Sequence, residues 1–320
     1  MAKLGEVCAF QSGGTPSKNK PEYFGGEIPW ISTTALNGGK INEADAVAWI
    51  TPKAIRESAA KIVPANSIMV GTRVGIGKVA INTVEMSTSQ DVISLIGIDK
   101  DKWYKPYLCK LLLSKKDYFN SQARGATIKG IKIDVVANID VPEIDYATQR
   151  KVAATLNKIE TLIVLRKQQL AKLDELVKAR FVEMFGDINV NNKKWMTYPL
   201  GELCTIVRGG SPRPIERYLG GTIPWIKIGD ATTGENIYLN STKEYIIQEG
   251  VKKSRMIKAG SLIFANCGVS LGFARIITFD GCIHDGWLAM EDIDEKLDKI
   301  FLLYSLNQMT EYFRKTAPAG

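Results

Sequence analysis

The chain of 320 residues contains an internal repeat, and this repeat limits its fold more than any other feature. Three segments return in order: 4–8 (Leu-Gly-Glu-Val-Cys) at 200–204, 13–16 (Gly-Gly-Thr-Pro) at 209–212, and 23–31 (Tyr-Phe-Gly-Gly-Glu-Ile-Pro-Trp-Ile) at 218–226. Leu4 and Leu200 lie 196 residues apart, and Phe119 and Phe313 lie 194 apart. A separation this constant predicts two copies of one module.

Each copy is predicted to be β-rich with short helices, because Gly and Pro pairs separate short β-branched stretches. Strands are expected at 67–70, 78–84 and 91–98. One closing helix is expected in each copy, at 102–120 and 297–314, and the first is followed by a basic turn and a strand at 124–133. The repeat pairs Gln90-Asp91 with His284-Asp285, and its shared Trp30 and Trp225 are expected to anchor the cores.

A long helix is predicted between the copies, from about residue 147 to 185, with Asp145 as its N-cap and Gly186 at its end. About 40 residues of helix span about 60 Å, which suits a spacer. Apolar residues alternate at spacings of four and three, which is typical of a coiled coil, although a helix lying on its own module is the alternative. The predicted partner interface is Val152, Leu156, Ile159, Ile163, Leu170, Leu173, Val177 and Met184.

The predicted fold class is therefore α+β, with two similar β-rich domains separated by a long coiled-coil-type helix. The domain limits are expected at 1–145 for the first module, 146–187 for the helical spacer and 188–320 for the second module.

Composition excludes several classes of protein. Hydrophobic residues make up 45% and charged residues 24%, as in ordinary globular proteins. No apolar run approaches the roughly 18 residues of a membrane span, and the first residues lack the apolar core of a signal peptide, so we expect a cytoplasmic protein without membrane contact. The single histidine and five scattered cysteines show no metal-ligand spacing, so no metal site is expected.

The sequence contains no complete catalytic motif of the kinds that it partly resembles. Residues 71–79 (Gly-Thr-Arg-Val-Gly-Ile-Gly-Lys-Val) are one residue too long for a P-loop and lack its Ser or Thr. A dinucleotide fingerprint over Gly75 and Gly77 is followed by an expected strand instead of a helix. Neither an Asn/Asp-Pro-Pro-aromatic methyltransferase loop nor a nuclease carboxylate cluster occurs, so no catalytic residue is predicted. An autonomous enzyme with an unrecognised site around His284-Asp285 is kept as an alternative.

Basic residues cluster near the glycine turns, and the net charge is +8, which favours a polyanionic partner. Arginine side chains can bind guanine edges or phosphates, and Gln or Asn can pair with adenine. Scaffold residues match between the copies while polar residues between them differ, as expected if one fold reads two DNA sequences. The candidate DNA-binding residues are Lys18, Lys20, Arg73, Lys78, Gln90, Arg124, Lys129, Arg208, Arg213, Arg217, Lys252, Lys253, Arg255, Asn266 and His284.

The ordered series at 13–16, 23–31, 141–144 (Val-Pro-Glu-Ile) and 148–153 (Thr-Gln-Arg-Lys-Val-Ala) resembles the specificity (S) subunit of type I restriction–modification enzymes, the HsdS family, over essentially the whole chain. The resemblance implies two target recognition domains, each reading half of a split DNA target, and a helix that docks the methyltransferase (M) subunits. It also implies a non-catalytic chain, with S-adenosylmethionine on the M subunits and ATP and Mg for restriction on a restriction (R) subunit. Type IIB systems use similar S subunits and are the alternative setting.

One departure from this family pattern concerns the second copy. A strand and helix corresponding to 127–185 are expected after it, but the sequence stops at 317–320 (Ala-Pro-Ala-Gly). The resemblance then implies either a natural shortening or a helix supplied by a second S chain. A fragment that competes for M subunits without reading DNA is a further alternative.

Overall fold

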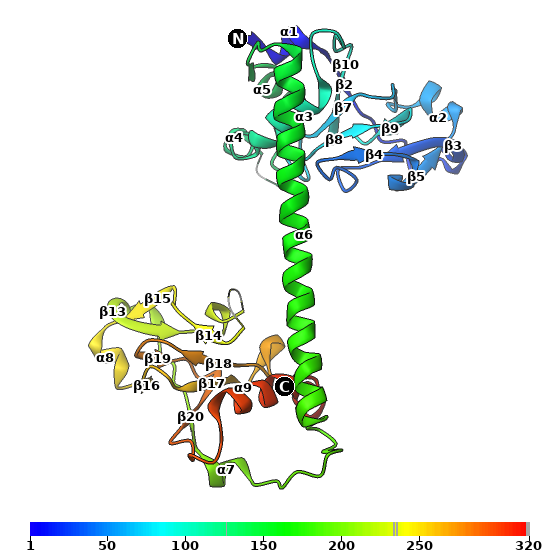
Figure 1. The fold of residues 1–320 in the computed structure, drawn as a ribbon. Helices are drawn as coiled ribbons and strands as arrows, with labels where there is room; N and C mark the ends of the chain where they lie inside the picture. Colours follow the sequence, from blue (N-terminus) through cyan, green and yellow to red (C-terminus); the bar gives the residue numbers. More distant parts are fainter. Residues whose placement is uncertain (126, 233, 235, 318–320) are drawn as a thin grey trace. The chain divides into compact units, whose positions relative to one another are not determined.

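The computed structural model describes residues 1–125, 127–232, 234 and 236–317 (Figure 1). The chain divides into two compact units, Met1–Lys167 and Gln168–Gly320. The division falls inside helix α6 (Tyr146–Phe185), and the domain limits drawn from the sequence stay predictions. Ala126 of the predicted 124–133 strand and residues 318–320 lie outside the described residues. Within the described residues, no helix is long and apolar enough to cross a membrane.

The first unit contains two main sheets, with strand orders β2-β10-β7-β8-β4 and β5-β3-β9-β6. Its strands are β1 (Ala2–Lys3), β2 (Ala9–Ser12), β3 (Phe24–Ile31), β4 (Lys40–Ile41), β5 (Ala48–Ile50), β6 (Ile62–Val63), β7 (Ile68–Gly71), β8 (Val79–Asn82), β9 (Met86–Thr88), β10 (Val92–Ile96) and β11 (Asp140–Val141). Its helices before α6 are α1 (Leu4–Val7), α2 (Pro52–Glu57), α3 (Lys105–Ser114), α4 (Lys116–Gln122) and α5 (Ile133–Ala137).

The second unit repeats this topology, with strand orders β12-β20-β17-β18-β14 and β15-β13-β19-β16. Its strands are β12 (Thr205–Arg208), β13 (Leu219–Ile226), β14 (Tyr238–Leu239), β15 (Glu244–Ile246), β16 (Arg255–Ile257), β17 (Leu262–Ala265), β18 (Ala274–Ile277), β19 (Gly281–Ile283) and β20 (Trp287–Glu291). Its helices are α7 (Leu200–Leu203), α8 (Gln248–Val251), α9 (Lys299–Gln308) and α10 (Thr310–Thr316). The predicted duplication and the α+β class are confirmed.

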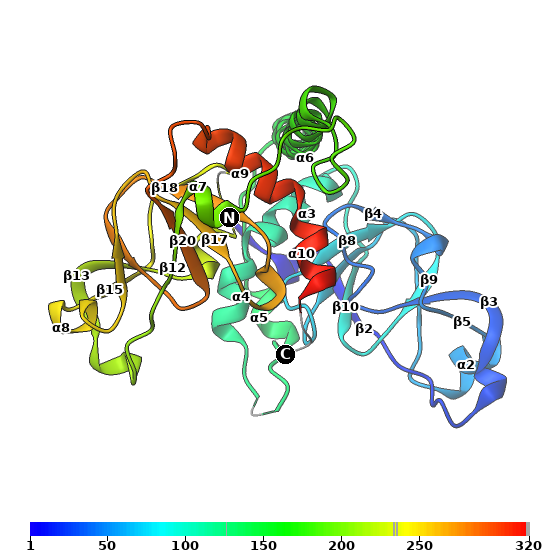
Figure 2. The same cartoon turned by 90° about the horizontal axis from the view of Figure 1, so that it is seen from below.

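Each unit has a core between one sheet and its closing helices. In the first unit, β7, β8 and β10 are almost fully buried, and α3 packs on their sheet through Leu108 and Leu112 (Figure 2). In the second unit, α9 packs on the matching sheet through Leu303. Strands buried on both faces read as continuous β-branched runs.

The predicted closing helices are wrong as single elements, because each is broken near its middle. Lys115 (φ −92°, ψ 10°) ends α3, and Met309 (φ −81°, ψ 4°) ends α9. The break turns the second helix so that Phe119 enters the core. The start of this second helix lies close to a glycine loop in each copy. A Cβ on Gly77 would lie 3.1 Å from the Lys116 Cα, and a Cβ on Gly272 would lie 3.1 Å from the Thr310 Cα.

The predicted strand at 124–133 is also wrong. A single β-bridge joins Arg124 and Gly130, and α5 begins at Ile133, so the described residues of this segment form no continuous strand. A basic, glycine-containing segment exposed to water has too few buried apolar residues to hold a full strand.

Strand pairing corrects the register of the repeat. Trp30 lies opposite Ser87, and Trp225 lies opposite Cys282. The backbone N–H of Ser89 donates to Ile31 as that of His284 donates to Ile226, so His284 corresponds to Ser89 instead of Gln90. The expected pairing of Gln90-Asp91 with His284-Asp285 was therefore wrong by one residue. Trp225 is buried and Trp30 half-buried in their cores.

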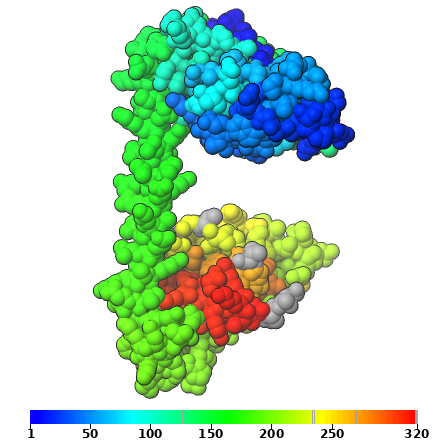
Figure 3. Space-filling model, turned by 90° about the vertical axis from the view of Figure 1, so that its right-hand side faces the viewer, coloured from blue at the N-terminus to red at the C-terminus, as the bar shows by residue number. Residues whose placement is uncertain are grey.

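Helix α6 begins within one residue of its predicted start and ends at its predicted end. The Thr148 N–H donates to Asp145 Oδ1 at 2.9 Å, so Asp145 is the N-cap, and Gly186 adopts φ +82° after the last turn. In the first unit, the α6 residue Gln149 is buried. In the second unit, the α6 residues Phe181 and Phe185 contact Phe301 of α9. All eight residues of the predicted stripe are exposed, between 37% for Val152 and 63% for Leu170, and α6 forms a continuous green surface in Figure 3.

Candidate nucleic-acid interface

Three loops of the first unit lie side by side and form what we call the first loop cluster: residues 13–17, 71–78 and 88–91. The Gly14 N–H donates to the Thr88 carbonyl at 2.9 Å, and the Thr72 N–H donates to the Asp91 carbonyl at 2.8 Å. The Gln90 N–H reaches Thr15 Oγ1 at 3.5 Å. The cluster therefore gathers segments that are far apart in the sequence onto one backbone framework.

Several predicted DNA-binding residues meet at this cluster. Arg73 is exposed, and its guanidinium lies 3.8 Å from the Asp91 carboxylate. The Ile131 N–H donates to the Thr72 carbonyl at 2.8 Å, and the Arg124 N–H donates to the neighbouring Gly130 carbonyl at 2.9 Å, so Arg124 and Arg73 line one hollow. Gln90, Lys78 and Lys129 are exposed on the same loops. The first unit thus presents mostly cationic side chains around Gln90.

The second loop cluster consists of residues 208–213, 266–271 and 284–286. Asp285 is its centre, because Ser211 Oγ donates to the carboxylate at 2.9 Å and Arg208 Nε donates to the Asp285 carbonyl at 3.1 Å. The guanidinium of Arg213 lies 3.7 Å from the same carboxylate. Burial raises the pKa of Asp285, but the Ser211 hydrogen bond and nearby positive charges outweigh burial and hold the pKa below 3.8.

His284 is half-buried in the second loop cluster. Its Nδ1 lies 2.9 Å from the Gly286 N and 3.0 Å from Asp285 Oδ1, so the two residues that follow His284 both contact this one ring nitrogen. Burial lowers its pKa below 6.5; Asp285 acts in the opposite direction, while Lys227 and Arg213 add to the lowering. At neutral pH the ring therefore offers one N–H donor. The ring lies 5.6 Å from that of Trp225.

The remaining predicted residues are less closely gathered. Lys20 Nζ donates to the Tyr23 hydroxyl at 2.9 Å, and Lys253 Nζ donates to the matching Tyr218 hydroxyl at 2.7 Å, so each copy places an ammonium beside the same tyrosine. Asn266 is half-buried in the second loop cluster, where its N–H donates to the Gly286 carbonyl. Four more candidates are exposed outside both clusters: Lys18, Arg217, Lys252 and Arg255.

Sequence reasoning missed Lys227, which follows the repeated Pro-Trp-Ile directly. Its ammonium lies 5.7 Å from the centre of the Trp225 ring and pairs with Glu244. The sequence did hold a signal for this residue, because Lys227 directly follows the repeated Pro-Trp-Ile strand, which fixes the position of its backbone. Tyr118 was also missed, and it lines a hollow described below together with Lys132, a basic residue of the 124–132 stretch.

The two clusters share a backbone framework but differ in side chains. The backbone hydrogen bonds of Thr72 and Asn266 are equivalent in the two copies, so Arg73 and Cys267 occupy equivalent positions. In the corrected register, Gln90 and Asp285 are also equivalent. The first cluster therefore presents an arginine and an amide where the second presents a thiol and a carboxylate.

Within the part of the chain that the structure describes, no three His, Cys, Asp or Glu side chains gather as a metal site.

Comparisons with known proteins bear on the family and the fold of the chain. The family model of the type I restriction modification DNA specificity domain matches residues 1–175 and 192–317, one match for each copy. The MjaIX type I restriction enzyme specificity subunit of Methanocaldococcus jannaschii is 27% identical over 331 residues, covering 96% of this chain and 75% of that protein.

One further relative and one solved structure extend the comparison. The EcoR124I/EcoR124II specificity subunit of Escherichia coli is 29% identical over 192 residues, which cover 58% of this chain and 46% of that subunit. A solved structure from work on complex assembly and conformational transition of the type I R-M system superimposes with a TM-score of 0.60 at 19% identity. It covers 98% of this chain and 80% of that one, and it bears on the fold alone.

Proposed function

Because this chain belongs to the family of type I restriction modification DNA specificity domains, we propose that it gives a DNA methyltransferase complex its target sequence. Each copy reads one half of a bipartite duplex target, the first through the first loop cluster and the second through the second. The observation that carries this proposal is the pair of matched loop frameworks with different side chains. Base edges are distinguished by donor and acceptor patterns, so one framework with exchanged side chains reads a different sequence.

The exposed stripe on α6 supports a second part of the proposal, the docking of M subunits. Stripe residues such as Leu156, Ile163 and Leu173 are between 38% and 49% exposed. A helix with apolar residues at heptad spacing is stabilised when a partner covers them. We assign this surface to the M subunits, with a helix of a second S chain as the other candidate.

The chain itself is proposed to be non-catalytic. S-adenosylmethionine then belongs to the M subunits, and ATP and Mg belong to an R subunit that joins the complex for restriction. The isolated chain is expected to show neither methyl transfer nor cleavage, and His284→Ala is expected to leave methylation by the assembled complex in place while its target preference changes in the second half only.

Methylome sequencing of a host that expresses this chain with its M subunit tests the main proposal. We expect modified adenines in two half-motifs separated by a fixed gap. Exchange of residues 1–140 should change one half only, and exchange of 197–320 the other. Modified sites without two half-motifs would contradict the proposal.

The docking surface has its own test. Leu156→Asp together with Leu173→Asp should abolish assembly with M subunits, measured by size-exclusion chromatography with light scattering, while hydrogen exchange in both units stays unchanged. The control pair Asn157→Asp and Lys172→Asp adds negative charge one position away along the same helix. If both pairs assemble equally well, α6 does not dock the M subunits.

A further inference from the structure

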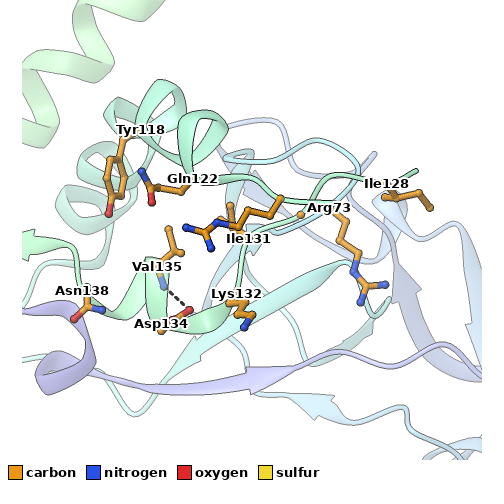
Figure 4. Close-up of a pocket in the computed structure, with 11 residues that line it drawn as sticks. Arg73, Tyr118, Gln122, Ile128, Ile131, Lys132, Asp134, Val135 and Asn138 are labelled. Carbon is orange, nitrogen blue, oxygen red and sulfur yellow. Dashed lines mark hydrogen bonds between the residues drawn. The ribbon is translucent and has the colours of Figure 1, made fainter. Parts of the chain in front are cut away.

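The first unit contains a hollow of about 600 Å³ beside the first loop cluster (Figure 4). Tyr118 and Gln122 of α4 lie on one side, with Lys132 before α5 and Arg73 of the 71–78 loop across from them, and Arg124 and Asn138 complete its polar lining. We call it the phosphate hollow, for the reasons that follow.

The lining is rich in hydrogen-bond donors. Arg73, Arg124 and Lys132 carry positive charge, and the hydroxyl of Tyr118 and the amides of Gln122 and Asn138 also donate. The carboxylate in the lining belongs to Asp134, whose Oδ1 already accepts the Val135 N–H at 3.0 Å. A site with several donors and a positive net charge suits an anion with several acceptor oxygens, which is what a phosphate provides.

The hollow is open to water at its rim. Tyr118 is 42% exposed and Ile128 is 62% exposed. Sites for small ligands usually bury most of the ligand surface. An open, cationic hollow instead fits a polymer that passes across it, such as the sugar-phosphate backbone of duplex DNA.

The hollow is continuous with the first loop cluster. Arg73 belongs to both, and the hydrogen bond from the Ile131 N–H to the Thr72 carbonyl fastens the edge of the hollow to the 71–78 loop. A duplex whose bases face Gln90 therefore has its backbone within reach of Arg124.

The repeat supplies an independent observation. Tyr118 and Tyr312 occupy the same position on α4 and α10, each followed by a phenylalanine that packs on its unit's core, and they are 42% and 49% exposed. The loop residues differ between the copies, whereas this exposed tyrosine is retained. A contact shared by both copies suits the phosphate backbone, which is the same for every DNA sequence.

We propose that the phosphate hollow binds backbone phosphates of the DNA beside the first half-site, through Arg124 and Lys132, and that it fixes the position of the duplex without reading a base. This inference rests on the proposed function, because it needs a duplex on the first loop cluster.

The test is the salt dependence of DNA binding by the chain assembled with its M subunits. The probe is a fluorescein-labelled duplex that carries the methylation motif, titrated between about 50 and 200 mM salt. Loss of two phosphate contacts in Arg124→Ala/Lys132→Ala should make the slope of log K against log salt less steep by about 1.8. Affinity should fall equally for motif and non-motif duplexes, and the methylated motif should stay the same.

The matched control is Lys40→Ala/Lys100→Ala, which removes the same charge from exposed positions of the same unit outside the hollow. Its slope should stay close to that of the unaltered complex. Tyr118→Phe removes one neutral donor and should weaken binding about two- to tenfold with the slope unchanged.

Three results would overturn the inference while leaving the proposed function in place. The first is an unchanged slope in the double variant, or an equal change in the control. The second is a changed motif, which would make Arg124 or Lys132 a base-reading residue. The third is loss of M-subunit assembly, which would make the hollow a protein contact. If the unaltered complex shows no preference for the motif duplex, the proposed function fails together with the inference.

Discussion

Gln149 is expected to be the most sensitive polar residue of the first unit. It lies in the first turn of α6 and is 1% exposed. Its Nε2 donates to the Lys102 carbonyl at 3.0 Å and to the Ile144 carbonyl at 2.9 Å, and its Oε1 accepts the Tyr104 N–H at 2.8 Å. One side chain therefore satisfies three backbone groups and ties α6 to the segment that precedes α3.

Replacement by alanine removes all three hydrogen bonds. At about 1 kcal/mol net for each hydrogen bond, the free energy of unfolding should fall by about 3 kcal/mol. Buried backbone groups left without a hydrogen-bond partner raise this loss to about 5 kcal/mol. Such a loss is a large share of the 5–15 kcal/mol that is typical of a folded domain. Gln149→Glu should be at least as harmful, because it places an oxygen opposite two carbonyl oxygens.

Hydrogen exchange measured by mass spectrometry on peptides from residues 99–112 is the assay. A loss of about 3–5 kcal/mol predicts exchange about 100- to 5,000-fold faster, at tenfold for each 1.4 kcal/mol. The control Gln168→Ala changes an exposed glutamine of the same helix and should alter stability by less than about 0.5 kcal/mol. Acceleration below about tenfold in Gln149→Ala would refute the reasoning.

Three further predictions concern single residues. A proton NMR titration should show one imidazole signal whose midpoint lies below 6.5, and this midpoint should move upward in Lys227→Ala. Because the pKa of His284 is lower in the folded state, the unfolded state binds this proton more readily. The contribution of His284 to stability should therefore be lost as the pH falls below about 6.5. A disulfide reagent should modify the exposed Cys267 first, and Cys267→Ser should remove this fast phase, because burial raises the pKa of the Cys109 thiol to about 11. Gly77→Ala should cost about 1–3 kcal/mol in urea unfolding, and more than Gly97→Ala, because both have positive φ but a Cβ at Gly97 meets open space.

The duplication could be predicted because short segments recur at a nearly constant separation, and the β-rich character and the ends of α6 could be predicted because their signals are local. Heptad spacing and the caps at Asp145 and Gly186 act within a few residues, so the sequence places them correctly. The breaks at Lys115 and Met309 could not be predicted in this way, because each is imposed by packing of the following helix on a distant sheet.

The candidate site was harder to predict, because its contacts are long-range. Ser211 and Asp285 are 74 residues apart, and the ladder of hydrogen bonds between their loops fixes their contact. The one-residue error at His284 also arose because strand pairing is long-range. The separation between the two copies changes along the chain, and a match of two residues does not show where the change occurs. Strand register, in contrast, cannot slip by one residue without turning every side chain to the opposite face.

The pairing of β1 with β11 has a consequence for synthesis on the ribosome. Ala2 pairs with Val141, and Lys3 Nζ lies 2.6 Å from Asp140 Oδ1, so the first residues complete their sheet only with a segment made 137 residues later. At about 5–20 residues per second, β1 waits roughly 7–28 s as an unpaired edge. Nascent chains of this protein should therefore need protection at β1 until β11 has been made.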